Sequence, residues 1–199
     1  MVTLITVAGT WGEKHPDAWF RWGSPWWNEA ERRGAQRANV DKYRWSTAID
    51  GIFGENESWE KAGWRLFEYI YACHETENEG SRPILVAHSH GGQISTLATS
   101  FGAPVRALIT VGTPIRRDME KVYSSSNFQA MPGTWTHIYS RSDWWQLFGG
   151  IGDGSISFRR KMKHAHRNIR AKGMSHADLH SVEAWNKQGW WNLIFGEEA

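Results

Sequence analysis

Residues 83–95 read PILVAHSHGGQIS and place Ser89 where an apolar run meets a pair of glycines. The run before the serine has the pattern of a buried strand, and apolar residues recur at helical spacing from residue 94 to residue 101. A chain that passes directly from a strand into a helix must turn sharply at residue 89. We therefore expect strained backbone angles at Ser89 and small neighbours two residues away, where Ala87 and Gly91 stand.

The start of the expected helix also has a chemical consequence. Gly92 allows the helix to pack close to the sheet, and the backbone N–H of His90 faces the space beside the serine hydroxyl. The joint therefore exposes an oxygen beside an amide that can stabilise an anion.

Strand and helix patterns alternate along the rest of the chain. The opening residues 2–8, VTLITVA, are apolar and β-branched, as expected of a strand that is covered on both faces. Further strands are expected at 38–46, 83–88, 104–112, 134–140 and within 164–173, and helices over 24–34, 58–75, 90–101 and 179–194. This alternation predicts an α/β fold with about six mostly parallel strands and helices on both faces. The active site of such a sheet lies at the carboxyl ends of its strands.

Length and composition narrow the class of protein. A chain of 199 residues with a formal charge of +2 fits one domain, residues 1–199, and gives no general reason to expect a nucleic-acid partner. The single cysteine, Cys73, cannot form an internal disulfide, which fits a reducing compartment. The apolar start has no basic leader and meets Gly9 too early for a signal peptide or a membrane span. We therefore expect a cytoplasmic protein without a transmembrane segment.

The segment around Ser89 resembles the nucleophile elbow of the α/β-hydrolase family. It has the A-H-S-x-G form found in small bacterial lipases, with Ala87 in place of the first glycine. The Gly-Thr-Pro turn at 112–114 is also similar to one that many lipases carry. The resemblance implies that Ser89 is the nucleophile of a serine hydrolase, activated by a histidine that a carboxylate orients.

The family order is serine, acid, histidine, and it directs the search for the acid to strand ends after residue 89. Asp143 comes just past the strand expected at 134–140, where the family usually carries its acid. Asp118 is the alternative, because some members use the preceding strand. It lies six residues beyond Gly112 in a charged run, so Asp143 is the preferred acid.

The segment SHADL at 175–179 resembles the loop that presents the family's histidine, and His176 is the expected base. His180 is the alternative, but it is expected one turn inside the final helix and directed away from the loop. His88 and His90 flank the serine, where side chains point elsewhere, so His90 contributes its backbone N–H alone.

The resemblance also implies an oxyanion hole with two donors. The His90 N–H is the first donor, and the loop after the first strand supplies the second. By position that second donor is Thr10, with Trp11 as the alternative.

Fourteen tryptophans are far more than ordinary usage explains. Trp11, Trp144 and Trp145 adjoin the expected donor and acid, so they are expected to contact the substrate. Others, such as Trp64 and Trp185, are expected to fill the space between sheet and helices.

Two segments are candidates for lid elements. Residues 12–27 carry four tryptophans, and residues 144–162 contain a glycine-rich stretch. The basic stretch 159–172 has no accompanying motif for nucleic-acid recognition and is expected to be solvated.

The sequence thus predicts a serine carboxylester hydrolase that works through an acyl-enzyme, without a cofactor, on a small-molecule or lipid-like ester. A thioesterase, an amidase or an acyltransferase would use the same residues. Two other classes stay open: a non-catalytic protein that binds an apolar ligand, and a metal-dependent hydrolase. The metal ligands of the last class would be His164 and His166, or His176, Asp178 and His180.

Overall fold

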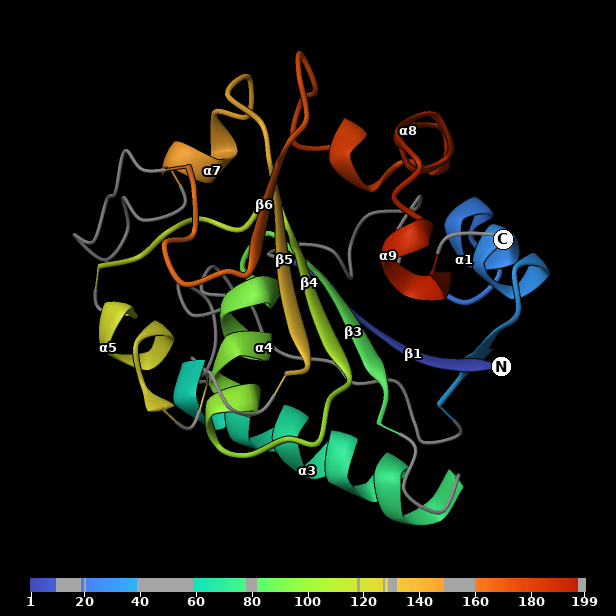
Figure 1. Ribbon diagram of the computed structural model, residues 1–199, viewed down its shortest axis with the longest axis vertical. Coiled ribbons are helices and arrows are strands. Elements are labelled where there is room, and N and C mark those ends of the chain that lie inside the picture. Colours follow the sequence, from blue (N-terminus) through green and yellow to red (C-terminus); the bar gives the residue numbers. More distant parts are fainter. Residues whose placement is uncertain are drawn as a thin grey trace, which may run out of the picture.

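A six-stranded sheet forms the centre of the protein (Figure 1). The computed structural model describes residues 1–9, 19, 21–38, 59–77, 82–117, 119–126, 128, 132–148 and 160–196. Within these residues the strands are β1 (Val2–Val7), β2 (Ala35–Arg37), β3 (Ile84–His88), β4 (Ala107–Val111), β5 (Thr134–Tyr139) and β6 (Arg167–Arg170). Their order is β2-β1-β3-β4-β5-β6, and every neighbouring pair is parallel. The predicted α/β fold with about six parallel strands is confirmed.

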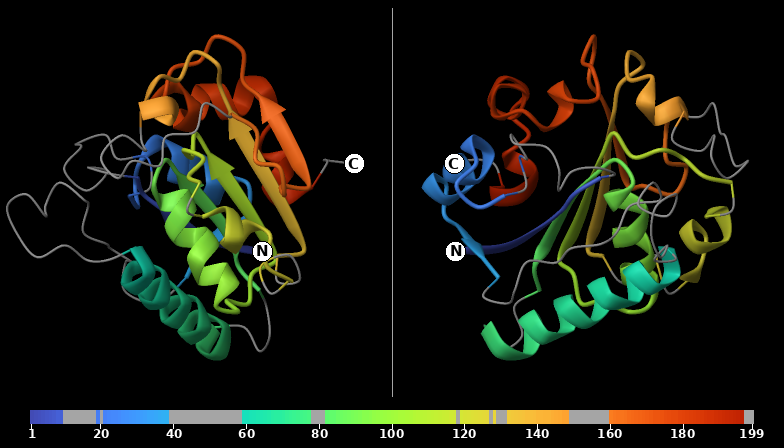
Figure 2. Two further views of the ribbon diagram at one scale, coloured as in Figure 1. Left: turned by 90° about the vertical axis from the view of Figure 1, so that its left-hand side faces the viewer. Right: turned by 180° about the vertical axis from the view of Figure 1, so that it is seen from behind.

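Helices cover both faces of the sheet, as the two views of Figure 2 show. One face carries α1 (Pro25–Arg32), α8 (Val182–Gln188) and α9 (Asn192–Phe195), and the other carries α3 (Trp59–Glu77), α4 (Gly91–Ser100) and α5 (Glu120–Tyr123). Two short elements follow the carboxyl ends of strands, α7 (Trp145–Phe148) after β5 and the 3-10 turn η3 (Asp178–His180) after β6.

Strand β3 shows why its sequence is apolar without interruption. Successive side chains of a strand point to opposite faces, so Ile84 and Val86 enter the core cluster beside α1, α8 and α9. Leu85 and Ala87 enter the cluster beside α3 and α4. Because both faces are covered, no position of β3 can be polar until the chain reaches its carboxyl end.

The second strand lies earlier in the chain than the sequence pattern suggested. We expected it at 38–46, but β2 spans Ala35–Arg37, and residues 39–58 lie outside the described part of the chain. Gly34 adopts a left-handed φ of 94° just after α1, and its carbonyl accepts the Val2 N–H at 3.1 Å. The chain therefore enters the sheet directly after the helix ends.

The expected final helix at 179–194 is divided into three pieces. Ser181 caps the start of α8 by accepting the Ala184 N–H at 3.1 Å, which leaves residues 178–180 in η3. Gly189 ends α8 with a left-handed φ of 66°, and α9 starts three residues later. The boundaries follow from these caps, which an apolar periodicity does not reveal.

Candidate active site

Ser89 occupies the turn between β3 and α4. Its φ is +53°, and among the described residues it is the one non-glycine with a positive φ. For a residue with a side chain this conformation costs roughly 1–2 kcal/mol. Ser89 donates its N–H to the Val111 carbonyl at 2.9 Å, which ties the turn to the end of β4. The expected strain at this residue is confirmed.

Close packing explains the two glycines that follow the turn. A Cβ on Gly91 would lie 2.3 Å from the Ala8 carbonyl oxygen, and one on Gly92 would lie 2.0 Å from Thr113 Oγ1. Helix α4 therefore packs directly against residues that follow β1 and β4, so a side chain at 91 would meet backbone and one at 92 would meet the Thr113 side chain. The predicted need for a small residue at 91 is confirmed.

The loop after β1 passes directly beside the serine. A Cβ on Gly9 would lie 2.5 Å from Ser89 Cβ and 3.2 Å from Ser89 Oγ. Thr10, the expected oxyanion donor, and Trp11, its alternative, lie outside the described residues.

A buried carboxylate and a histidine meet at the same edge of the sheet. Asp143 follows β5 and is completely buried, and its Oδ2 lies 2.7 Å from His176 Nδ1. Its Oδ1 accepts the Gln146 N–H at 3.0 Å, and its carbonyl accepts from the guanidinium of Arg160. With both carboxylate oxygens occupied, Oδ2 is held toward the imidazole.

Two further contacts bring this pair beside the serine turn. Gly112, at the end of β4, has a φ of +58°, and a Cβ there would lie 3.1 Å from Asp143 Oδ2 and 3.2 Å from His176 Nδ1. His88, the residue before Ser89, has its Nε2 3.2 Å from the His176 carbonyl oxygen. Strands β3 and β4 are neighbours in the sheet. The serine, the carboxylate and the imidazole therefore lie together at the carboxyl ends of the strands.

No protein-family model matches the sequence, and a search of curated proteins found no match. Solved structures do match. A lipase of Bacillus licheniformis in its mature form is 15% identical over 97% of this chain and 92% of its own, with a TM-score of 0.61. A hydrolase of the alpha/beta superfamily from Xanthomonas campestris is 17% identical over 95% and 99%, with a TM-score of 0.51. An extracellular α/β-hydrolase from Paenibacillus is 11% identical over 98% and 99%, with a TM-score of 0.55.

The protein has the α/β-hydrolase fold. At these identities the likeness concerns the fold alone, so the chemistry of the site depends on its own geometry.

The histidines and the aspartate considered as alternatives to His176 and Asp143 lie elsewhere in this α/β-hydrolase fold or outside its described part. His180 lies in η3 rather than inside the final helix, since Ser181 starts α8. Its ring stacks on Trp19, with centroids 5.8 Å apart. The His90 ring meets the edge of Trp59 at 5.1 Å. Asp118, the alternative acid, lies outside the described residues.

Two of the three tryptophans expected at the substrate are exposed. Trp144 and Trp145 follow Asp143 directly and are 64% and 61% exposed. Trp11 belongs to the residues that the structure leaves undescribed. Of the tryptophans expected to fill space, Trp185 is buried, but Trp64 is 49% exposed because it lies on the outer side of α3.

The segments expected to form lids are only partly described. Residues 12–18, 20 and 149–159 lie outside the described part of the chain. Trp26 and Trp27 are buried in the core cluster beside α8 and α9.

A pocket of about 520 Å³ borders the loop that carries His176. It is lined by Trp19 and Trp22, which precede α1, by Trp26 of α1, and by Ala177 and His180. The three tryptophans give this pocket an apolar part near the candidate base, while Arg21 and Glu183 also line it.

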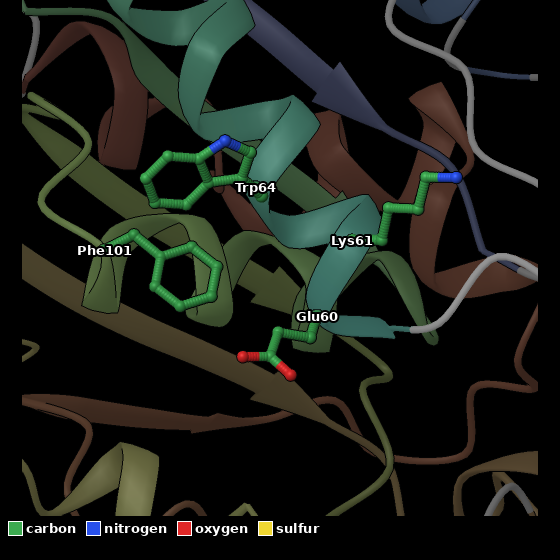
Figure 3. Close-up of a pocket in the computed structure, with 4 residues that line it drawn as sticks. All are labelled: Glu60, Lys61, Trp64 and Phe101. Carbon is green, nitrogen blue, oxygen red and sulfur yellow. The ribbon is translucent and has the colours of Figure 1, made fainter.

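A second pocket, of about 430 Å³, lies away from the site (Figure 3). It is lined by Glu60, Lys61 and Trp64 of α3 and by Phe101. Phe101 caps the carboxyl end of α4, whereas Ser89 precedes its amino end. The ten-residue helix between them is roughly 15 Å long, so this pocket does not belong to the serine turn.

The described residues contain no group of three or more His, Cys, Asp or Glu side chains arranged to hold a metal ion. In the same part of the chain, no helix is both long and apolar enough to cross a membrane.

His137 of β5 is a buried histidine below the site. Its Nε2 donates to the Arg160 carbonyl at 3.1 Å, and its Nδ1 lies 2.9 Å from Thr110 Oγ1. Burial lowers the pKa of His137 to about 4. The His137 ring therefore stays neutral in the folded protein at pH values where it would be protonated in the unfolded chain.

Stability is expected to fall in mild acid because of this residue. Between about pH 6.5 and 4 the unfolded state binds a proton that folded His137 does not, so the free energy of unfolding decreases by about 3 kcal/mol as pH is lowered. Urea unfolding at several pH values measures the slope, and His137→Gln should make it shallower across this window, with the contribution of buried His88 remaining. Equal slopes for both proteins would assign the acid sensitivity to other groups.

Proposed function

We propose that this protein is a serine carboxylester hydrolase in which Ser89 is the nucleophile, His176 the general base and Asp143 the residue that orients the base. One observation carries the proposal. The strained turn at Ser89 has a φ of +53°. It lies at the same end of the sheet as the Asp143 carboxylate and the His176 imidazole, which form a hydrogen bond of 2.7 Å. A chain keeps such strain where a function requires the exposed hydroxyl.

The hydrogen bond to Asp143 defines the tautomer of the base. His176 donates its Nδ1–H to the carboxylate, so its Nε2 is left with the lone pair that can accept the serine proton. Ser89 Oγ attacks the ester carbonyl carbon while the proton passes to Nε2. The same proton then goes to the leaving alcohol, and an acyl-serine forms. Water attacks this ester with Nε2 again as base, and the acid product leaves Ser89 regenerated.

The charge on the tetrahedral intermediate needs donors beside the serine. We propose the backbone N–H of His90, at the start of α4, as one of them. The loop after β1 supplies the other, with Thr10 as the proposed donor and Trp11 as the alternative. The contact between Gly9 and Ser89 supports this part of the proposal, because it brings that loop to the serine hydroxyl.

The proposed substrate is an ester with an apolar group. Trp144 and Trp145 expose large aromatic surfaces immediately after the proposed acid, which supports contact between these rings and substrate. Trp11, which follows β1 in the sequence, is proposed as a further substrate contact. Thioesters, amides and acyl transfer to another alcohol would use the same three groups, and comparing rates on matched substrates separates them.

Labelling with a fluorophosphonate tests the proposed function. The reagent should attach one group per chain, and the modified peptide should contain Ser89. His176→Ala should slow labelling by about 10²–10⁴-fold, the usual contribution of a general base. Ser142→Ala, which alters an exposed serine near Asp143, is the matched control and should label normally.

Two results would contradict the proposal. A folded protein that takes no label and cleaves no activated ester would indicate a binding function. Ester cleavage that resists the reagent but stops with a chelator would indicate a metal-dependent hydrolase.

A further inference from the structure

His88, the last residue of β3, joins two parts of the site that are distant in sequence. Its Nε2 lies 3.2 Å from the carbonyl oxygen of His176, 88 residues further along the chain. A carbonyl oxygen can only accept a hydrogen bond, so the His88 ring must donate its Nε2–H. The residue before the proposed nucleophile thus binds the backbone of the proposed base.

The surroundings of the ring hold it in this orientation. Its centroid lies 4.3 Å from that of the His176 ring, and the rings of His180 and Trp19 meet it edge-on at 4.6 and 6.3 Å. His88 is buried, and burial lowers its pKa well below the ordinary value, with the nearby His176 and His180 acting in the same direction. The ring therefore stays neutral, and the carbonyl acceptor selects the tautomer that carries its proton on Nε2.

The loop that carries His176 also has hydrogen bonds of its own. Ser175 donates its N–H and Oγ–H to Asp178 Oδ2, at 2.8 and 2.7 Å, but these bonds join residues within the loop and define its shape alone. The bond to Asp143 holds the imidazole through its Nδ1. The bond from His88 adds a second anchor, on the His176 backbone.

We propose that His88 is a positioning residue, which fixes the backbone of His176 to the strand that bears Ser89 and thereby sets the distance from the base to the nucleophile. The inference rests on the proposed function, since it assigns no chemistry to His88 itself. A displacement of about 1 Å between reacting groups can reduce turnover by about 100-fold.

Two substitutions of similar volume test the proposal. His88→Leu fills the space without a donor, whereas His88→Gln supplies an amide N–H near the position of Nε2. His88→Leu should lower kcat on an activated ester by about 100-fold with KM changed less than about twofold. His88→Gln should recover kcat to within about fivefold of the wild type.

A matched control comes from the amino ends of the strands, away from the site. His166 Nδ1 accepts the Trp135 N–H at 2.9 Å at the start of β5, so His166→Leu removes another bond between a histidine and the backbone. It should leave kcat and KM unchanged. Thermal unfolding of all variants identifies effects that come from stability alone.

The outcomes separate this inference from the proposed function. If Ser89→Ala abolishes turnover but His88→Leu and His88→Gln lose kcat equally, or neither loses it, the positioning role is wrong and the serine mechanism stands. If Ser89→Ala retains turnover, the proposed function fails first.

Discussion

Ser89→Ala is expected to reduce turnover of a short p-nitrophenyl ester by about 10⁶-fold. The variant lacks the oxygen that forms the acyl-enzyme, and no other nucleophile at the turn replaces it in the proposed mechanism. Its fold should change little, because alanine meets the same backbone strain at a φ of +53° and removes a single oxygen. Initial rates, corrected for spontaneous hydrolysis, and the melting temperature measure the two effects.

A companion variant examines the strain itself. Ser89→Gly should also be inactive. Its free energy of unfolding should nevertheless be about 1 kcal/mol higher than that of the wild type, because glycine adopts a positive φ without steric cost. Greater stability with no activity would show that the turn is strained for function. Turnover that persists in both variants would falsify the serine mechanism.

Asp143→Asn is expected to lower kcat by about 10⁴-fold while the protein stays folded. The surroundings of the residue decide how the new amide sits. The Gln146 N–H requires an acceptor at the Oδ1 position, so the asparagine oxygen takes that place and its NH₂ group faces His176 Nδ1. The imidazole must then accept a hydrogen bond at Nδ1 and carry its proton on Nε2. A protonated Nε2 cannot accept the proton of the serine.

Steady-state kinetics on the same activated ester measure this loss, and the variant should keep its fluorophosphonate site with a much slower labelling rate. Asp118→Asn is the comparison, because Asp118 is the alternative acid from the sequence. It should retain turnover within a few-fold of the wild type. Loss of turnover in Asp118→Asn with activity kept in Asp143→Asn would transfer the orienting role to Asp118.

Much of the fold could be predicted from local patterns. The apolar run of β3, the helical spacing of α4 and the small residues around Ser89 are short-range signals, and the structure has the strand, the strained turn and the helix where they indicate. The residues expected as acid and base, Asp143 and His176, are joined by a hydrogen bond in the structure. Their catalytic roles stay proposals.

Other features depend on residues that meet only in the folded chain. The sequence indicated only that the His88 side chain points away from the serine, yet its Nε2 reaches the His176 carbonyl, a contact between residues 88 positions apart. It also gave no sign that Trp26 and Trp27 would be buried against the final helices while Trp64 would be exposed.

The sequence by itself determined the alternation of strands and helices and the strained joint at Ser89, because hydrophobic periodicity and small residues act over a few positions. Only the tertiary structure decided which side chains anchor the candidate base and which tryptophans form the core. Those contacts form because the sheet brings loops that are distant in sequence to the carboxyl ends of its strands. The number of residues between two loops does not predict how far apart they lie in space.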